Sequence, residues 1–330
     1  MSQSTLAIRP SASLIVAAPI PTKNVLDKDD YDFRVLMLKR NGKSNFVHAH
    51  VFPGGIVDSF DHFSHWKSIL SVSGQTQEEL EEAQNTLTSK ICAIRETFEE
   101  SGLLLTNPPA HTVSGFLTDE WRNVVHKDPS QFKVMCEKYK IEPAVDKLTP
   151  FSNWITPTIE KRRYNTQFYL TVLGQTIEEE HKEIVEVSAD GQETVQLDWF
   201  KPQQVIENWK NETVKLFPPQ YYTMVELAKV LHHKDLLENA GINVFRTKSG
   251  QPIELLPQGN QTDPNDILAP KGSKVFLSLP GDHEYKATDT DTNSDGPKVK
   301  TGNLHRIYIE GPMASFKIVR NLDFDTKAKL

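Results

Sequence analysis

The chain has 330 residues, 38% of them hydrophobic and 25% charged, a balance typical of one globular domain with an extension. Its net charge of −7 argues against a surface that binds nucleic acid in general. The two cysteines, Cys92 and Cys136, exclude a disulfide scaffold and indicate a reducing compartment. No run approaches the roughly 18 apolar residues of a transmembrane helix, so no membrane span is expected.

The first predicted elements are two β-strands. Residues 12–19 form a β-rich run, and residues 32–39 carry apolar side chains on both faces, which is typical of a strand buried on both sides. The sequence FPGG, Phe52 to Gly55, is a turn signal. Residues 59–89 are expected to be irregular apart from an acidic helical stretch, QEELEEAQ. Residues 90–102 then predict an amphipathic helix that stops at Gly102.

The second half of the chain predicts further strands and then a change of composition. Strands are expected at 165–173 and 193–200, and a helix at 221–233. Residues 256–300 are rich in Pro, Gly, Asp, Asn and Thr, and the run DTDTNSDGPK is expected to be a mobile loop. Short strands at 274–279 and 304–310 flank it. The predicted organisation is a main domain over 1–239 and a C-terminal β-rich extension over 240–330.

The helix at 90–102 carries an unusual cluster of acids. At 100° per residue, Glu96, Glu99 and Glu100 share one face to within about 100°. The opposite face is apolar, with Ile91, Ile94 and Phe98. Like charges at these spacings repel one another. The cluster is therefore either a solvated acidic face, which is the more common case for glutamates alone, or a site for a hard cation such as Mg²⁺, which prefers oxygen ligands.

Two segments resemble the Nudix box. The sequence RETFEESGL, from Arg95 to Leu103, is similar to its second half, and FPGG is similar to its start. The box normally has Glu six residues after its first glycine, and Asp61 stands there in this chain. Residues 62–94 form an insertion that splits the box. Whether Asp61 is a metal ligand stays open.

The resemblance implies a Nudix α/β/α sandwich around a mixed sheet and hydrolysis of a nucleoside diphosphate with Mg²⁺ or Mn²⁺. By position, Glu99 and Glu100 would be metal ligands, and Glu96 would be a ligand or the catalytic base. Arg95 would be a catalytic-site residue that orients Glu99 through an i, i+4 pair. Gly54 and Gly55 would lie against the substrate and metal, where a glycine lets the backbone come close.

Three further segments narrow the resemblance: HVFPGG, residues 151–170, and WFKP followed by LFPPQYY. With the split box, they resemble the peroxisomal coenzyme A diphosphatases, which implies cleavage of coenzyme A or acyl-CoA to 3′,5′-ADP and (acyl-)4′-phosphopantetheine. The alternatives are another nucleoside diphosphate substrate, such as a nucleotide sugar, a dinucleotide polyphosphate or an RNA cap, and a nucleotide-binding Nudix protein without catalysis. Asn165 stands where this subgroup usually has Asp.

Several residues outside the box are candidates for substrate binding. Arg162 and Arg163 precede a strand and are suited to phosphate contacts, although alternation is expected to turn one of them to solvent. Trp154 either walls a substrate pocket or, more commonly for such a residue, packs in the core. Glu193 is either a supporting ligand or base, or a surface glutamate.

The last three residues, Ala328, Lys329 and Leu330, resemble the peroxisomal address Ser-Lys-Leu. This ending predicts a location in the peroxisomal matrix and recognition by the import receptor for such tripeptides.

Overall fold

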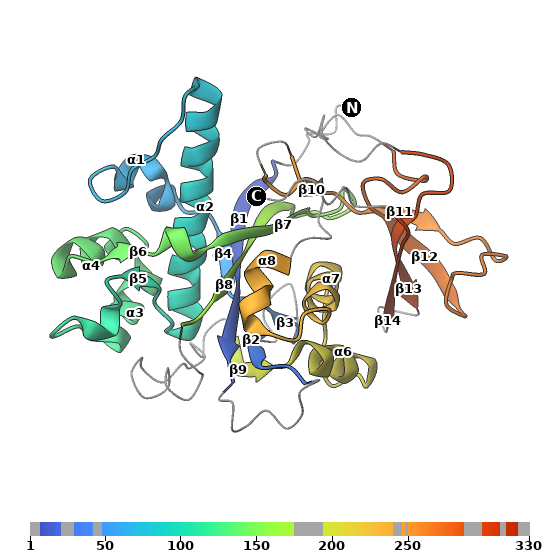
Figure 1. The fold of residues 1–330 in the computed structure, drawn as a ribbon, viewed down its shortest axis with the longest axis horizontal. Coiled ribbons are helices and arrows are strands. Elements are labelled where there is room, and N and C mark those ends of the chain that lie inside the picture. The colour runs from blue at the N-terminus through green and yellow to red at the C-terminus, as the bar shows by residue number, and fades with distance from the viewer. Residues whose placement is uncertain are drawn as a thin grey trace.

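The computed structural model describes residues 7–20, 30–41, 48–174, 194–239, 246–247, 250–286, 299–310 and 315–322. Within these ranges a large mixed sheet has helices on both faces, and a second, smaller sheet lies to one side (Figure 1). The predicted α/β/α sandwich with a β-rich C-terminal extension is therefore confirmed. The run DTDTNSDGPK lies outside the described residues.

Eight strands of the described chain form the central sheet. Their order is β10-β7-β8-β1-β2-β3, with β4 also paired to β1 and β9 to β2. The bounds are β1 Arg9–Pro19, β2 Phe33–Arg40, β3 His50–Val51, β4 Gly54–Ile56, β7 Thr149–Ile155, β8 Tyr164–Val172, β9 Thr194–Phe200 and β10 Glu254–Leu255. Strand β1 is parallel to β8 and antiparallel to β2 and β4, so it joins the two halves of the sheet.

Strand β2 shows why this sheet needs cover on both faces. Phe33, Val35 and Met37 lie in the hydrophobic core on one face, and Leu36 lies in the core on the other. All four side chains are fully buried. The prediction of a strand buried on both sides is confirmed.

Helix α2 (Gln77–Ser101) covers one face of the sheet. Its apolar residues Ile91, Ile94 and Phe98 are fully buried in the same cluster as Leu14 and Val16 of β1, so the predicted packing stripe is confirmed. Smaller elements extend this layer: α1 Phe63–Trp66, α3 Thr118–Lys127, α4 Gln131–Tyr139, and the paired strands β5 Thr106–Asn107 and β6 Glu142–Pro143.

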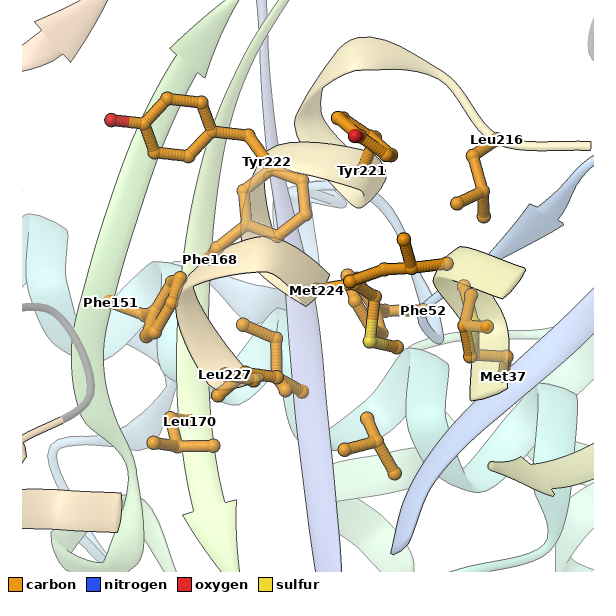
Figure 2. Close-up of a cluster of buried hydrophobic side chains, with 14 of the residues drawn as sticks. Met37, Phe52, Phe151, Phe168, Leu170, Leu216, Tyr221, Tyr222, Met224 and Leu227 are labelled. Carbon is orange, nitrogen blue, oxygen red and sulfur yellow. The ribbon is translucent and has the colours of Figure 1, made fainter. Parts of the chain in front are cut away.

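The opposite face is covered by α6 (Pro202–Lys210), α7 (Pro218–Leu227) and α8 (Leu236–Asn239). Figure 2 shows Met224 and Leu227 of α7 among Phe52, Phe168 and Leu170. Aromatic and aliphatic side chains of this kind supply most of the apolar area that a core buries.

The C-terminal extension is a four-stranded antiparallel meander of β11 Gln258–Gln261, β12 Ser273–Ser278, β13 His305–Glu310 and β14 Ser315–Arg320. Phe316 of β14 stacks on Trp209 of α6 with 4.9 Å between ring centroids. Arg320 donates a 2.7 Å hydrogen bond to the Tyr222 hydroxyl of α7. Because β10 also adds to the edge of the central sheet beside β7, the extension packs on and completes the main domain.

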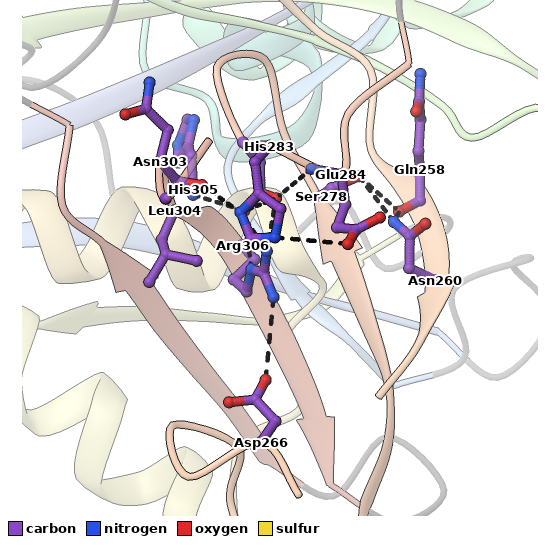
Figure 3. A network of polar contacts seen from close by, with 12 residues as sticks. Gln258, Asn260, Asp266, Ser278, His283, Glu284, Asn303, Leu304, His305 and Arg306 are labelled. Carbon is purple, nitrogen blue, oxygen red and sulfur yellow. Dashed lines mark hydrogen bonds and ion pairs between the residues drawn. The ribbon is translucent and has the colours of Figure 1, made fainter. Parts of the chain in front are cut away.

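The extension has a polar centre of its own around Arg306 (Figure 3). Arg306 forms a bidentate ion pair with Asp282, at 2.8 and 2.7 Å, and its guanidinium lies 4.2 Å from the centroid of the Phe276 ring. Asp266 accepts a hydrogen bond from Tyr308 and lies 4.0 Å from Arg306. The ion pair connects Asp282, which lies between β12 and β13, to Arg306 of β13.

Two predicted helix bounds were wrong, and some helices were missed. The box helix begins at Gln77 instead of residue 90, because Thr76 and Glu79 form a capping box that starts the helix earlier. The helix expected at 221–233 runs from Pro218 to Leu227. Helices α3, α4 and α6 were not predicted. In the described residues, no helix is long and apolar enough to cross a membrane.

Candidate active site

The box helix is fixed at its end by local chemistry. Its C-terminal cap is Gly102, in the left-handed conformation with φ of 79°, and the Gly102 N–H donates to the Phe98 carbonyl. A glycine adopts this conformation without steric cost. The insertion supplies α1 and the part of α2 up to Ile94, so the final stretch of about two turns, which carries the glutamates, is continuous with it.

Arg95 is the centre of the acidic cluster. Its Nε and Nη2 donate to the two oxygens of Asp61, both at 2.8 Å, and its Nη1 donates to Glu99 at 2.7 Å. Glu96 lies 3.0 Å from Nη2. Arg95 is 2% exposed and Asp61 is 1% exposed. The predicted i, i+4 pair is present, and Asp61 is held by an arginine on both of its oxygens.

Two glycines of β4 contact the other glutamates. The Gly54 N–H donates to Glu100 Oε2 at 2.8 Å. A Cβ added at Gly55 would lie 2.4 Å from the Glu96 carboxyl carbon, so only glycine leaves room for that carboxylate. Gly54 therefore binds Glu100, and Gly55 leaves the space that the Glu96 carboxylate occupies.

The cluster is buried and negatively charged. Glu99 and Glu100 are 6% and 3% exposed, so they are not part of a solvated acidic face. Burial raises the pKa of Glu96 to about 7, against the opposing effect of Arg95. Burial also raises the pKa of Glu99, again opposed by Arg95. One arginine faces three carboxylates, and a further cation would relieve the surplus charge.

Helix α3 adds two contacts to Glu99 that the sequence analysis missed. Arg122 Nε donates to the Glu99 carbonyl at 2.8 Å, and His126 Nδ1 lies 3.6 Å from Glu99 Oε2. Arg122 and His126 are four residues apart, which places them on one helical face. That spacing was visible in the sequence, but nothing in it indicated that this face meets the end of the box helix.

The predicted substrate-binding residues differ in their exposure and contacts. Arg162 is exposed. Arg163 is partly buried and donates from Nε to the Thr156 carbonyl at 2.9 Å. Trp154 is 3% exposed and packs edge-on against Tyr222 with 5.5 Å between centroids, which agrees with the packing interpretation. Glu193 lies outside the described residues, so its role stays a prediction.

The cysteine on the box helix has a packing role. Cys92 is fully buried, and burial raises the pKa of its thiol well above the ordinary value. Its Sγ lies 3.8 Å from the Gly55 carbonyl. Among the residues that the structure describes, no three His, Cys, Asp or Glu side chains converge to hold a metal ion. The box glutamates contact protein donors in this arrangement.

Comparison with known families identifies the family of the chain. The NUDT19 Nudix domain family matches residues 8–89 and 72–227, which include the two glycines, Asp61 and the box helix. The chain belongs to the NUDT19 Nudix family. The split box is thus a Nudix box whose two halves are joined in space by the pair of Arg95 and Asp61.

Curated members of the NUDT19 family cover most of the chain. A Xenopus laevis protein named acyl-coenzyme A diphosphatase NUDT19 is 32% identical, with 84% of this chain and 81% of that protein aligned. The Homo sapiens protein of the same name is 29% identical over 62% of this chain and 63% of its own length. A Caenorhabditis elegans protein named putative nudix hydrolase 7 is 28% identical, covering 71% and 69%.

A solved structure supports the fold. The crystal structure of a NUDIX hydrolase from Alicyclobacillus acidocaldarius aligns with a TM-score of 0.56 and 18% identity, covering 71% of this chain and 97% of that one. At this identity the likeness concerns the fold alone.

Proposed function

We propose that this protein hydrolyses the diphosphate bond of coenzyme A or acyl-CoA, releasing 3′,5′-ADP and (acyl-)4′-phosphopantetheine. The observation that carries the proposal is the intact set of box carboxylates, with Glu96 and Glu99 beside Arg95 and Glu100 bound by the Gly54 N–H, in a chain that is 32% identical to a protein named acyl-coenzyme A diphosphatase. The similarity extends over 84% of this chain, well beyond the box.

The cluster is suited to a hard divalent cation, and we propose Mg²⁺ or Mn²⁺. All of the candidate donors are carboxylate oxygens, which these ions prefer. Bound there, the cation would neutralise diphosphate charge and lower the pKa of a bound water. Glu99 and Glu100 would hold the ion, and Glu96 would be a ligand or the base.

The other residues of the cluster keep these carboxylates in place. Arg95 fixes Glu99 Oε1, and the Gly54 N–H fixes Glu100 Oε2. Asp61 pairs with Arg95 on both oxygens, so we propose that it holds the arginine in position and is not itself a ligand. Such partners of ligands commonly change metal affinity or activity by about 10- to 100-fold when removed.

The test is a substrate panel incubated with Mg²⁺ or Mn²⁺, with the products identified by mass. Coenzyme A and a short acyl-CoA should each yield 3′,5′-ADP and the matching phosphopantetheine. Inert coenzyme A with rapid turnover of a nucleotide sugar, a dinucleotide polyphosphate or capped RNA would replace the substrate. Tight nucleotide binding without any product would indicate a binding protein.

We propose in addition that Ala328-Lys329-Leu330 directs the protein to the peroxisomal matrix through the import receptor for such tripeptides. Support comes from the likeness of this ending to Ser-Lys-Leu. A fluorescent protein fused before residue 1 should give punctate peroxisomal fluorescence, and deletion of Leu330 should make it cytosolic without changing catalysis. Identical distributions of the two proteins would reject the signal.

A further inference from the structure

A row of polar side chains crosses the sheet on the face that carries the box helix. The register pairs Gly55 of β4 with Ala12 of β1, Ala12 with Gln167 of β8, Gln167 with Asn153 of β7, and Asn153 with Glu254 of β10. Residues paired across neighbouring strands point to the same face. The row therefore begins at Gly55, against the Glu96 carboxylate.

The spacing between strands gives the distance of each residue in this row from Gly55. Neighbouring strands lie about 4.8 Å apart, so Gln167 is about 10 Å and Asn153 about 14 Å from Gly55 across the sheet. Asn165 lies two residues before Gln167 in β8, and Arg163 two residues before Asn165. Alternation along β8 puts Asn165 and Gln167 on the same face, and Arg163 comes immediately before the first residue of β8, Tyr164. We call Asn153, Arg163, Asn165 and Gln167 the polar strip.

Three buried atoms of the polar strip have no hydrogen-bond partner among the described residues. They are Asn153 Oδ1, Asn165 Oδ1 and Arg163 Nη2. Asn153 is 3% exposed. The Asn165 amide is oriented by Glu254, because its Nδ2 donates to Glu254 Oε1 at 2.8 Å and a carboxylate only accepts. The Asn165 side-chain oxygen, Oδ1, is therefore the atom of this amide that lacks a hydrogen-bond partner among the described residues.

Buried polar atoms without partners destabilise a fold, so three of them on and just before the neighbouring strands β7 and β8 indicate a ligand or ordered water. Two amide oxygens accept hydrogen bonds, and the guanidinium carries a positive charge. An adenine amino group with a nearby phosphate offers the matching donors and charge. The pantetheine arm is uncharged and gives no role to Arg163.

We propose that the polar strip binds the adenosine 3′-phosphate end of coenzyme A, with Arg163 contacting the 3′-phosphate and the amides contacting the adenine. This inference rests on the proposed function, since it takes the diphosphate to lie at the box glutamates. Arg163 is already held by the Thr156 carbonyl, so little conformational entropy is lost when the phosphate binds. Lys161 and Arg162, the two residues before Arg163 in the sequence, have exposed side chains.

Binding of the product fragment tests the polar strip without catalysis. Calorimetry in EDTA should show that wild type binds 3′,5′-ADP at least about tenfold more tightly than 5′-AMP, as one charge-assisted contact predicts. Arg163→Gln should remove this preference. Lys161→Gln, which removes a charge from an exposed neighbour, should retain it. An unchanged preference in Arg163→Gln, or none in wild type, would overturn the proposal.

A double-mutant cycle separates binding from folding. Asn165→Asp places a carboxylate against Glu254 and should lower the melting temperature, and Glu254→Gln in the same chain should restore it. The restored double variant should keep the wild-type preference for 3′,5′-ADP over 5′-AMP, because position 165 still presents an oxygen that accepts from the adenine amino group and Arg163 is unchanged. Loss of this preference at restored stability would show that Arg163 does not select the 3′-phosphate and would overturn the proposal.

The two proposals fail in different ways. If wild type does not hydrolyse coenzyme A but binds 3′,5′-ADP through Arg163, the proposed reaction is wrong and the phosphate contact stands. If coenzyme A is hydrolysed and Arg163→Gln keeps the wild-type ratio of kcat/KM for coenzyme A over 3′-dephospho-coenzyme A, the polar strip is rejected and the reaction stands.

Discussion

Two buried Arg–Asp ion pairs in the chain share one bidentate geometry, but the charges around them differ. Arg95 in the box donates from Nε and Nη2 to the two oxygens of the buried Asp61. Arg306 in the extension donates in the same way to the buried Asp282. Around Arg95 two more carboxylates, Glu96 and Glu99, crowd the same guanidinium.

Around Arg306 there is one further carboxylate among the described residues, Asp266, which lies 4.0 Å away and accepts a hydrogen bond from Tyr308. Asp282 also accepts from the backbone N–H groups of Glu284 and His305, and Arg306 lies over the Phe276 ring. Although burial alone raises the pKa of Asp282, the hydrogen bonds from Arg306 and from the Glu284 and His305 N–H groups hold this pKa below its ordinary value. In the box, burial raises the pKa of Glu96 to about 7. An incomplete charge balance thus distinguishes the candidate metal site from a structural pair.

The largest expected effect is on turnover. Glu99→Gln and Glu100→Gln each remove an anionic oxygen from the cluster and should lower kcat by at least about 100-fold, since even a partner of a ligand is worth 10- to 100-fold. Both variants should keep the wild-type circular dichroism spectrum. Near-normal rates at saturating Mg²⁺ in both variants would contradict the assignment of the box glutamates.

Replacing each arginine by methionine compares what the two ion pairs contribute to stability and to turnover. Arg95→Met leaves Asp61, Glu96 and Glu99 without their shared cation and should lower the free energy of unfolding by about 3–5 kcal/mol, the usual cost of removing one partner of a buried pair. Turnover should fall as well, because Glu99 loses its anchor. Urea unfolding and steady-state rates measure the two effects.

Arg306→Met is the matched variant in the extension. It should cost less, about 2–3 kcal/mol, because two backbone N–H groups still satisfy Asp282. Its rate per folded molecule should stay within about twofold of wild type, since distant sites act independently. A rate loss as large as that of Arg95→Met would show that the extension takes part in catalysis.

Metal addition should affect only the box. Mg²⁺ at 100 times its dissociation constant should stabilise wild type by about 2.7 kcal/mol, seen as a higher melting temperature, and should stabilise Arg306→Met equally. Glu99→Gln and Glu100→Gln should lose most of this gain. A shift that persists in both glutamine variants would place the metal elsewhere.

The smallest expected effect is on acid stability. The folded pKa of Asp282 lies below its ordinary value, so its contribution is fully present above about pH 4 and is lost as pH falls through the folded pKa. Between about pH 5 and pH 2, wild type should therefore lose more unfolding free energy than Asp282→Asn. Parallel stability curves for the two proteins would contradict the shifted pKa.

The sequence by itself determined the local features. Residues 95–103 indicated the carboxylate cluster, Gly102 marked the end of the helix, and alternation identified β2, because spacing along a helix or strand fixes which side chains share a face. Similarity to the Nudix box followed from the same residues. The start of α2 was missed because the capping box at Thr76 lies inside an insertion with no periodic pattern before it.

Only the tertiary structure decided which distant residues meet. Asp61 and Arg95 are 34 residues apart and join the split box, and His126 of α3 reaches Glu99 from outside it. The polar strip exists only because β7 and β8 are neighbours, and its register with Gly55 depends on β1 and β4 following β8 in the sheet. Strand order and helix docking depend on burial of apolar area summed over the whole chain, and that sum cannot be read from any one segment.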